Sequence, residues 1–448
     1  MGKTIRINKG YNIKLKGKAP LTIKNHPQAE TFAIKPTDFH GLVPKLHVQV
    51  GTEVKAGTTI LHDKYNENVL ITAPVSGEVI EINRGEKRKL LEVKILADKD
   101  LKYEDFGAAD PSGLSEEQVK EKILKSGCWP FIRQRPFDVI AKPENTPNEI
   151  FISAFDTNPL AADMSFVVQG KEKEFQTGVN ALKQLTSGNV HVNVHANSDS
   201  SVFTNASGVE VNTFKGPHPA SNVGVQIHHL SPISKGKVIW YVNPQDVIII
   251  GRLFLEGKFI PKKTIAVAGP QIKEPYYAEV LVGTSVKSFI DDNLKENLSR
   301  LISGSVLTGE AISGEGYLGF YHSQLTAIKE GNYPEFLGWA LPGFGKLSLT
   351  RAFWSWLTPN KEFELDTNTH GEERPFVMSN QYDNLFPMDI YPVALLKSIM
   401  VNDMDKMEQF GILEVAPEDF ALCEFACTSK INSQEIVREG LDIMLKEG

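Results

Sequence analysis

The side chains best suited to redox chemistry in this chain are three cysteines, Cys128, Cys423 and Cys427. The last two follow the spacing Cys-x₃-Cys, which is similar to the end of an iron–sulfur cluster motif in which proline comes next. Here Thr428 stands in place of the proline, and the upstream cysteines of the motif are missing. Because a [4Fe–4S] cluster takes four cysteine ligands, we expect no cluster on this chain. Residues four apart share one face of a helix, so the two thiols are expected to pack in the core.

A second pattern that could bind a cofactor is a GxGxxG string that begins at Gly314. In a dinucleotide site this string follows a strand and opens a helix, whose N-terminus receives the pyrophosphate. The residues that follow it, 320–328 (FYHSQLTAI), are aromatic and β-compatible and predict a strand instead. A P-loop is also missing, because Lys346 is followed by Leu347 rather than by serine or threonine. We therefore expect no nucleotide site in either segment.

Histidine is the other metal-binding residue type here, and the sequence has two groups of them. His191 and His195 lie four apart on a predicted strand, and therefore on one face of it. The spacing of a zinc site, H-E-x-x-H, is missing, so no metal site is predicted. Gly216 and His218 belong to a glycine-bearing turn before a predicted helix, where backbone N–H groups could bind an anion. They are candidate cofactor contacts, and surface or hydrogen-bonded structural histidines are the alternative.

The aromatic segment 353–357 (FWSWL) is followed by Pro359. A compact aromatic loop could contact a quinone or a membrane protein, which makes Trp354 and Trp356 further candidate contacts. Packing of these rings in the protein core is the competing interpretation. No residue of the chain is assigned a catalytic role.

Two glycine-rich turns, Gly51–Gly57 (GTEVKAG) and Ala73–Val79 (APVSGEV), resemble those of the biotinyl/lipoyl barrel-sandwich domain. The glycines suit the positive φ angles of such hairpin turns. Asp63 and Lys64 are similar to the Asp-Lys pair of lipoyl carriers, which raises the alternative of a lipoyl or biotin carrier. The stretch from Lys64 to the second turn is longer than usual, so we expect an unmodified structural domain.

The composition indicates an ordinary globular protein of several domains, with 448 residues, 41% of them apolar, and a net charge of −7. The acidic balance argues against nucleic-acid binding. Three cysteines do not make a disulfide framework and suit a reducing compartment. The apolar runs Val238–Val242 and Val247–Ile250 are far shorter than the roughly 20 residues of a membrane helix. The basic N-terminus lacks an apolar stretch, so no signal peptide and a soluble, cytoplasmic chain are expected.

Along the chain the pattern predicts a multidomain α+β and α/β protein. The expected parts are a barrel-sandwich domain at 1–97, a Rossmann-like α/β domain at 114–256, a small α+β unit of β-grasp size at 260–311, and a mixed segment with a C-terminal helical domain at 312–448. Ser115 predicts the cap of a helix that ends near Lys125, and a short helix is expected over 286–293. Pro417 is predicted to open one late helix, and Ser433 to cap the last.

Several longer strings closely resemble the NqrA family of the Na⁺-translocating NADH:quinone oxidoreductase. They run in order through nearly the whole chain: Asn83–Arg88, Trp129-Pro130, Arg133–Pro136, Asp156–Asp163, Gly216–Ala220, Gly269–Gln271, Ile302–Gly309, Pro387–Ile390 and Ala421–Cys423. Thr428 departs from the pattern, because a proline is expected there. The resemblance implies an SLBB β-grasp domain over 260–311, in agreement with the strand pattern of the same segment.

The resemblance also implies a peripheral member of a six-subunit translocase on the cytoplasmic face of the bacterial inner membrane. That complex oxidises NADH, reduces ubiquinone or menaquinone and exports Na⁺. It implies that FAD, FMN, riboflavin and the [2Fe–2S] cluster belong to other subunits, and that this chain carries no redox cofactor. Its partners would be the other five subunits (B to F), with membrane association only through them, and it would act in assembly and in forming the quinone site. A free-standing flavin- or nicotinamide-dependent oxidoreductase is the alternative, because strands and helices alternate in 114–256.

Overall fold

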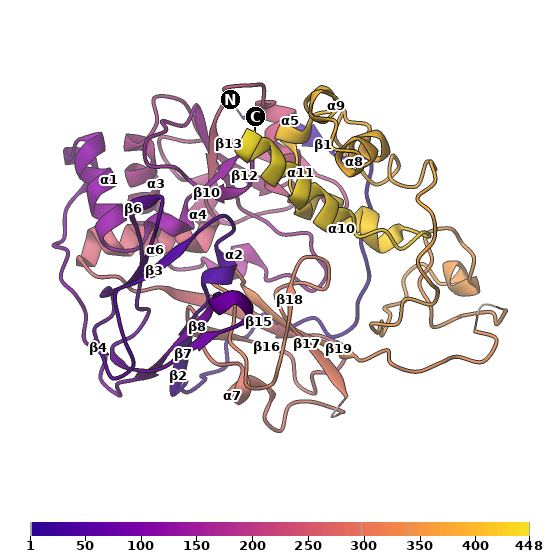
Figure 1. Cartoon of the computed structure of the whole chain (residues 1–448), viewed down its shortest axis with the longest axis horizontal. Helices are drawn as coiled ribbons and strands as arrows, with labels where there is room; N and C mark the ends of the chain where they lie inside the picture. Colours follow the sequence, from indigo (N-terminus) through magenta and orange to yellow (C-terminus); the bar gives the residue numbers. More distant parts are fainter. Residues whose placement is uncertain (1, 297, 339, 448) are drawn as a thin grey trace.

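The computed structural model of the chain describes residues 2–296, 298–338 and 340–447. Figure 1 shows the α/β sheet and the C-terminal helices in the upper part of the view, and the barrel strands β2, β4, β7 and β8 with β15–β19 in the lower part. In these ranges, six short 3₁₀ turns lie between the larger elements: η1 Pro36–Asp38, η2 Glu86–Arg88, η3 Pro111–Gly113, η4 Trp129–Phe131, η5 Trp354–Leu357 and η6 Ile412–Glu414. Within the described residues, none of the helices is both long and apolar enough to cross a membrane.

The α/β domain is built on a seven-stranded sheet with the order β1-β13-β12-β11-β14-β9-β10. Its strands are β1 Thr4–Arg6, β9 Arg133–Arg135, β10 Val139–Ile140, β11 Glu149–Ser153, β12 Val190–His195, β13 Glu210–Lys215 and β14 Ile239–Tyr241. The strands β13, β12, β11 and β14 are parallel. After β11, the chain adds β12 and β13 on one side of it and then β14 on the other side. This is the Rossmann order, and it places a topological switch point between β11 and β14.

The helices of this domain are α1 Glu116–Lys125, α2 Met164–Val167, α3 Glu172–Gln184, α4 Ser201–Thr204, α5 Val223–Leu230 and α6 Pro244–Glu256. The predicted cap at Ser115 is confirmed, with a complete capping box to Gln118. Helices α3 and α6 pack backbone to backbone: a Cβ at Gly251 would lie 1.8 Å from the carbonyl oxygen of Glu174. Only glycine permits this approach.

The barrel-sandwich domain consists of two small sheets. One contains β2 Thr31–Ile34, β4 Glu53–Val54, β7 Gly77–Arg84 and β8 Leu90–Ala97, and the other β3 Pro44–Leu46, β5 Thr59–Asp63 and β6 Asn66–Thr72. Lys64 and Tyr65 form the turn between β5 and β6. Most of the residues between Lys64 and the second glycine turn therefore form the strand β6. At the first residue of β7, Gly77 has a φ of +151°, where a Cβ would lie 1.9 Å from the oxygen of Leu96.

The SLBB unit is a five-stranded sheet with the order β16-β15-β19-β17-β18. Its elements are β15 Lys262–Ala268, β16 Tyr276–Leu281, α7 Lys287–Ile290, β17 Ser299–Ser303, β18 Glu310–Ile312 and β19 Gln324–Lys329. The helix expected over 286–293 is wrong in extent, because Asp292 adopts a φ of +59° that no right-handed helix contains. The strand expected over 320–328, after the GxGxxG string, is present as β19 but begins only at Gln324, and no helix follows that string.

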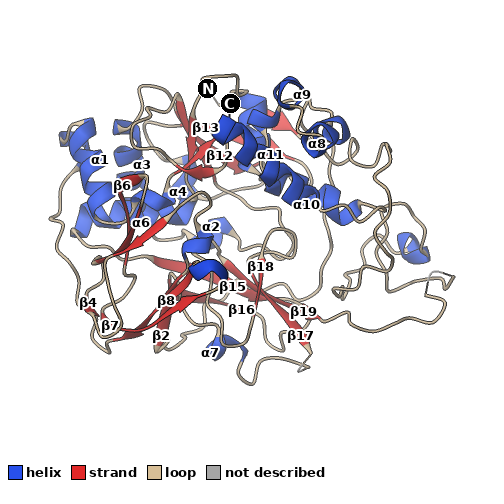
Figure 2. Cartoon of the chain, viewed as in Figure 1, coloured by secondary structure: helices blue, strands red, loops and turns tan. Residues whose placement is uncertain are grey.

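The C-terminal helices are α8 Pro392–Met400, α9 Met404–Gln409, α10 Pro417–Ala426 and α11 Ser433–Glu447 (Figure 2). Pro417 opens α10 as predicted. The expectation that Ser433 caps α11 is wrong, because Ser433 is already the first helical residue and its hydroxyl donates to the carbonyl oxygen of Phe420. These helices pack around a core that includes Leu395, Phe420 and Leu441, and that extends to Phe214 on β13 and Val225 on α5 of the α/β domain.

The N-terminus does not follow the expected division of the chain. The sequence pattern places residues 1–97 in the barrel-sandwich domain, yet β1 pairs in parallel with β13 at the edge of the α/β sheet. Further along, Leu15 bridges to Phe363, so the first residues reach the mixed segment as well. A three-residue strand carries too little periodicity to be recognised in the sequence.

Candidate functional site

A cavity of about 170 Å³ lies beside the switch point of the α/β sheet. Residues that directly follow β11 line it, among them Phe155, Asp156 and Asn158, and so do Val242 and Asn243 after β14. Because parallel strands end at the same edge of a sheet, the two loops meet there. Such crevices are where open α/β sheets bind ligands. The remaining lining residues come from other parts of the chain: Phe131, Arg133, Ser153, Met164, Ser221, Asn222, Val223, Tyr241, Asp246, Tyr321 and Glu418.

The main cationic group of the cavity is Arg133 on β9. Its guanidinium lies between two aromatic rings, 5.2 Å from the ring centre of Tyr241 and 4.8 Å from that of Tyr321. It also donates to Asp138 at 2.7 Å, and the hydroxyl of Tyr241 donates to the same carboxylate oxygen. Burial alone would raise the pKa of Asp138, but Arg133 and Arg135 together hold it well below its usual range. Arg133 is thus a fixed, charged hydrogen-bond donor on an aromatic support.

Helix α10 brings two carboxyl groups to the same place. Nη2 of the fully buried Arg135 lies 2.7 Å from Glu418, and Nη1 lies 3.6 Å from Asp419. With Asp138, three carboxyl groups therefore face the two arginines of β9. Desolvation, opposed by Arg135 and reinforced by Asp419, raises the pKa of Glu418 to about 7. Glu418 lines the cavity, so the cavity contains a carboxyl group that is partly protonated at neutral pH.

The other polar groups of the cavity mostly hold the structure together. Asn243 caps α6 by accepting from the backbone N–H of Gln245 at 3.0 Å. Asp246 forms a buried ion pair with Lys263 at 2.8 Å, which joins α6 to the SLBB sheet. Asn158 donates to Asp156 at 2.8 Å within its own loop. The loop arrangement is therefore fixed before any ligand arrives.

Gly216 and His218 lie behind the cavity rather than in it. A Cβ at Gly216 would lie 2.4 Å from the carbonyl oxygen of Ile7, which explains the glycine by packing. His218 is buried, and its Nδ1 lies 3.1 Å from the hydroxyl of Thr157. That hydroxyl contacts Ser221, which does line the cavity. Desolvation lowers the pKa of His218 to about 4, so its ring is neutral at pH 7.

Trp354 and Trp356 lie elsewhere, in the segment between β19 and α8, and line no part of this cavity. Core packing, the competing interpretation, does not describe them, because their side chains are 56% and 50% exposed. The structure therefore separates the four candidate contacts into two places. The prediction that these residues contact a cofactor stays a prediction.

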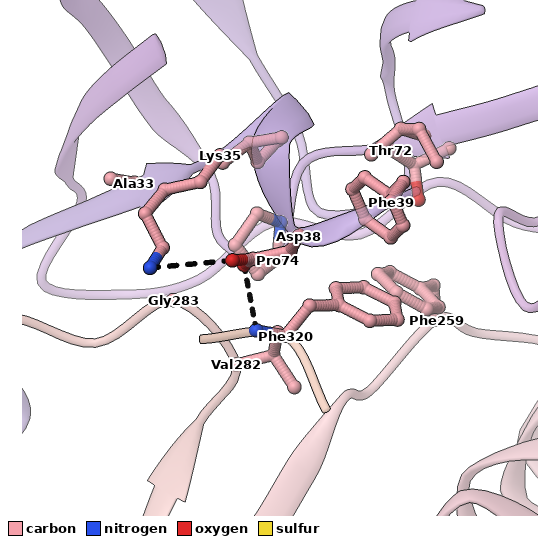
Figure 3. A pocket seen from close by; sticks show the side chains of 12 residues that line it. Ala33, Lys35, Asp38, Phe39, Thr72, Pro74, Phe259, Val282, Gly283 and Phe320 are labelled. Carbon is pink, nitrogen blue, oxygen red and sulfur yellow. Dashed lines mark hydrogen bonds and ion pairs between the residues drawn. The ribbon is translucent and has the colours of Figure 1, made fainter. Parts of the chain in front are cut away.

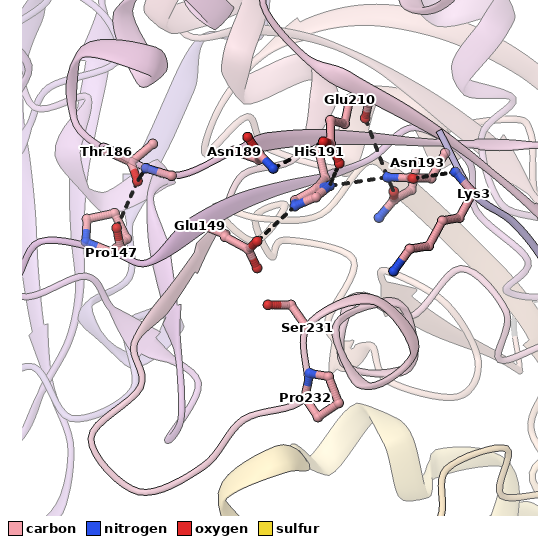
Figure 4. Close-up of polar contacts among 12 residues, drawn as sticks. Lys3, Pro147, Glu149, Thr186, Asn189, His191, Asn193, Glu210, Ser231 and Pro232 are labelled. Atoms are coloured by element: carbon pink, nitrogen blue, oxygen red, sulfur yellow. Dashed lines mark hydrogen bonds and ion pairs between the residues drawn. The ribbon is translucent and has the colours of Figure 1, made fainter. Parts of the chain in front are cut away.

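The buried histidine His191 and the three cysteines occupy structural positions. His191 is buried between Glu149 and Glu210, 3.5 Å from a carboxylate oxygen of each (Figure 4). Cys128, Cys423 and Cys427 are all free and buried. Burial raises the pKa of the Cys128 thiol to about 12 and that of Cys423 further, so both remain protonated at neutral pH. Among the described residues, none of the His, Cys, Asp and Glu side chains gather in a group of three suited to a metal ion.

A second, much smaller cavity of about 10 Å³ lies where the barrel meets the SLBB unit (Figure 3). Asp38 accepts from the backbone N–H of Phe320 at 2.9 Å, and the buried ammonium of Lys35 lies 3.3 Å from Asp38 and 2.8 Å from Glu310. A space of that size holds no ligand larger than water. Its polar contacts hold the barrel-sandwich domain against the SLBB unit.

The sequence matches full-length relatives that are named as the A component of the Na(+)-translocating NADH-quinone reductase. That of Yersinia pestis bv. Antiqua (strain Angola) is 39% identical over 99% of this chain and 100% of the relative. That of Vibrio parahaemolyticus is 37% identical over the same shares, and that of Rhodopirellula baltica is 36% identical over 99% and 98%. The chain belongs to this family, NqrA.

Three domain families agree with this membership. The "NqrA N-terminal barrel-sandwich hybrid domain" matches residues 5–98, the "NqrA second alpha/beta domain" residues 114–259, and the "NQRA C-terminal domain", an SLBB domain, residues 264–314. The predicted fold class is thereby confirmed. Among solved structures, an NAD⁺-reducing [NiFe]-hydrogenase in the H₂-reduced state matches with a TM-score of 0.36 and 8% identity over 68% of this chain and 55% of that chain. That likeness is too distant to carry an argument.

The sequence patterns do not reveal the residues that make the cavity: Arg133, Tyr241, Tyr321 and Glu418. Arg133 does lie in one of the strings that carry the family resemblance, and Asp156 and Asn158 lie in another. The order of the strands in the sheet brings the family string on β9 and the family string after β11 to the same cavity. The alternation of strands and helices in the sequence does not determine that order.

Proposed function

We propose that this chain acts, within an Na⁺-translocating NADH-quinone reductase, as a component without a redox cofactor that helps to assemble the complex and forms part of its quinone site. The other subunits, B to F, would carry FAD, FMN, riboflavin and the [2Fe–2S] cluster. The chain would lie on the cytoplasmic face of the bacterial inner membrane, bound through these partners. Family membership supports the role in the complex. The cavity at the switch point supports the quinone role.

The single observation that carries the quinone proposal is Arg133 between Tyr241 and Tyr321. A quinone ring is flat and apolar, and its two carbonyl oxygens accept hydrogen bonds. The cavity offers apolar walls at Phe131 and Phe155 and a charged donor at one side. Reduction of a quinone to a quinol takes up two electrons, which the flavins of the partner subunits would supply, and two protons, one of which Glu418 in the cavity lining would donate.

The test is photo-crosslinking of a quinone analogue in the assembled complex, followed by identification of the labelled peptides. We expect label on residues 153–158 or 241–246 of this chain. In Arg133→Leu the KM for quinone should rise, while Arg300→Leu, on an exposed ion pair far from the cavity loops in sequence, serves as the matched control. Label confined to other subunits, together with an unchanged KM in Arg133→Leu, would contradict the proposal.

The strand order favours one competing function. A Rossmann order with a cavity at its switch point is also the arrangement of a free-standing flavin or nicotinamide enzyme. Against it, the loop after β11 from 154 to 163 contains no glycine, whereas close approach of a pyrophosphate to the backbone requires one. An absorbance spectrum of the purified chain separates the two functions, since near-stoichiometric bound flavin would favour the enzyme.

A further inference from the structure

Between β19 and α8 the chain forms a loop-rich projection, residues 333–338 and 340–361, which we call the aromatic lobe. In Figure 1 it is the orange segment that extends beyond the sheets and helices on the right. Its large apolar side chains face solvent, and Phe336 is 89% exposed. The most exposed members are Phe336, Leu341, Phe344, Trp354, Trp356 and Leu357.

The lobe has internal order despite this exposure. The rings of Phe344 and Trp354 meet edge to face with centres 6.0 Å apart, and the N–H of Trp354 donates to the oxygen of Pro342 at 2.8 Å. At its base, Gly331 donates to the hydroxyl of Thr367 at 2.8 Å. A structured tip that keeps its apolar side chains in water costs stability, and contiguous apolar surface of this kind marks a contact with something else.

The charges of the lobe indicate what that contact is. Between residues 333 and 361 the sequence has three cations, Lys346, Arg351 and Lys361, and one carboxylate, Glu335. Glu335 forms an ion pair with Lys346, so the remaining charges are positive. The chain as a whole has a net charge of −7. The tip is thus complementary to an anionic surface, although the rest of the molecule is not.

The residue types at the tip of the lobe favour a lipid surface as its contact. Its exposed apolar side chains include two tryptophans, and the guanidinium of Arg351 lies 5.8 Å from the ring centre of Trp356. Tryptophan rings with neighbouring Lys and Arg side chains are typical of the membrane–water interface.

We propose that the aromatic lobe inserts its tip into the headgroup region of an anionic lipid bilayer. This contact adds to attachment through partner subunits and positions the chain relative to the membrane plane. It is independent of the quinone proposal, since the lobe and the cavity share no residues.

The first test is sedimentation of the full chain with vesicles of phosphatidylcholine, with and without phosphatidylglycerol. We expect binding to the anionic vesicles that weakens as salt is added. Replacing Trp354 and Trp356 by serine should weaken it about tenfold or more, because two half-exposed rings lose their burial. The matched control is Tyr391→Ser with Val401→Ser, whose side chains are at least as exposed but lie outside the lobe.

The second test uses lipids brominated in the acyl chain, which quench nearby tryptophan. Trp129 and Trp240 are fully buried and do not respond. In the assembled complex in such a bilayer we expect quenching, reduced when Trp354 and Trp356 are both replaced by phenylalanine. Absence of vesicle binding, or equal loss in the control pair, overturns the proposal. Quenching in the complex that is unchanged when Trp354 and Trp356 are replaced also overturns it, and then a partner protein covers the lobe.

Discussion

The carboxylate of Glu418, at the start of α10, lies 2.7 Å from Nη2 of Arg135 on β9, a residue 283 positions away in the chain. Arg135 is fully buried, and Asp138 and Asp419 also face it. The contact joins the C-terminal helices to the α/β sheet beside the cavity. It is both a structural link and the source of the unusual electrostatics of the site.

Removing the cation at the centre of this contact should destabilise the protein. In Arg135→Met, Asp138 and Asp419 remain buried and lose a cationic partner, so we expect a loss of about 3–5 kcal/mol in the free energy of unfolding. Unfolding in urea measures it. Arg300→Met breaks the partly exposed pair with Glu330 and should cost less than about 1 kcal/mol. Equal effects in the two variants would contradict the assigned role of Arg135.

The raised pKa of Glu418 predicts a pH dependence of stability. An acid whose pKa is about 7 in the folded state, above its ordinary value of 4.5, binds its proton more tightly when folded. Its contribution is fully present below pH 4.5 and is lost as the pH rises through 7. The melting temperature should therefore fall between about pH 5 and pH 8 in the wild type, and fall less in Glu418→Gln. An identical pH profile in the two proteins would show that Glu418 titrates normally.

The sequence is sufficient to predict those elements that depend on interactions between residues close together in the chain. The cap at Ser115 and the proline at the start of α10 each depend on residues a few positions apart. The short helix fails at Asp292, whose left-handed backbone conformation is set by its surroundings and not by its residue type. The strand β1 is not predicted because its partner, β13, lies more than 200 residues away.

The site is less predictable than the fold for the same physical reason. Arg133, Tyr321 and Glu418 come from β9, from the loop before β19 and from α10, and only the packing of three domains brings them together. Nothing in the spacing of these residues indicates that contact. The exposure of Trp354 and Trp356 is equally hidden, because an aromatic run has the same composition whether it lies in a core or on a surface.

The close packing of α3 on α6 makes Gly251 sensitive to any side chain. A Cβ there would lie 1.8 Å from the carbonyl oxygen of Glu174, so the helices must move apart in Gly251→Ala. Overpacking of this kind costs about 1–3 kcal/mol, measurable by urea unfolding. Gly113→Ala, where a Cβ would meet nothing within 4 Å, should stay within about 0.5 kcal/mol of the wild type. If Gly251→Ala is as stable as Gly113→Ala, the helices are not packed this closely.

Lys64 remains the one residue that could make the barrel a carrier domain, since it lies at the β5–β6 turn. The neighbouring Asn66 donates to Glu144 at 2.6 Å, and Thr72 at the end of β6 donates to the oxygen of Ser126. The hairpin is thus bound along its length to the α/β domain, whereas a carrier lysine must move between distant sites. We expect the intact mass of the chain, purified from its complex, to show no lipoyl or biotinyl group. We also expect quinone reduction to be unchanged in Lys64→Arg. A mass increase that disappears in Lys64→Arg would instead identify the barrel as a carrier.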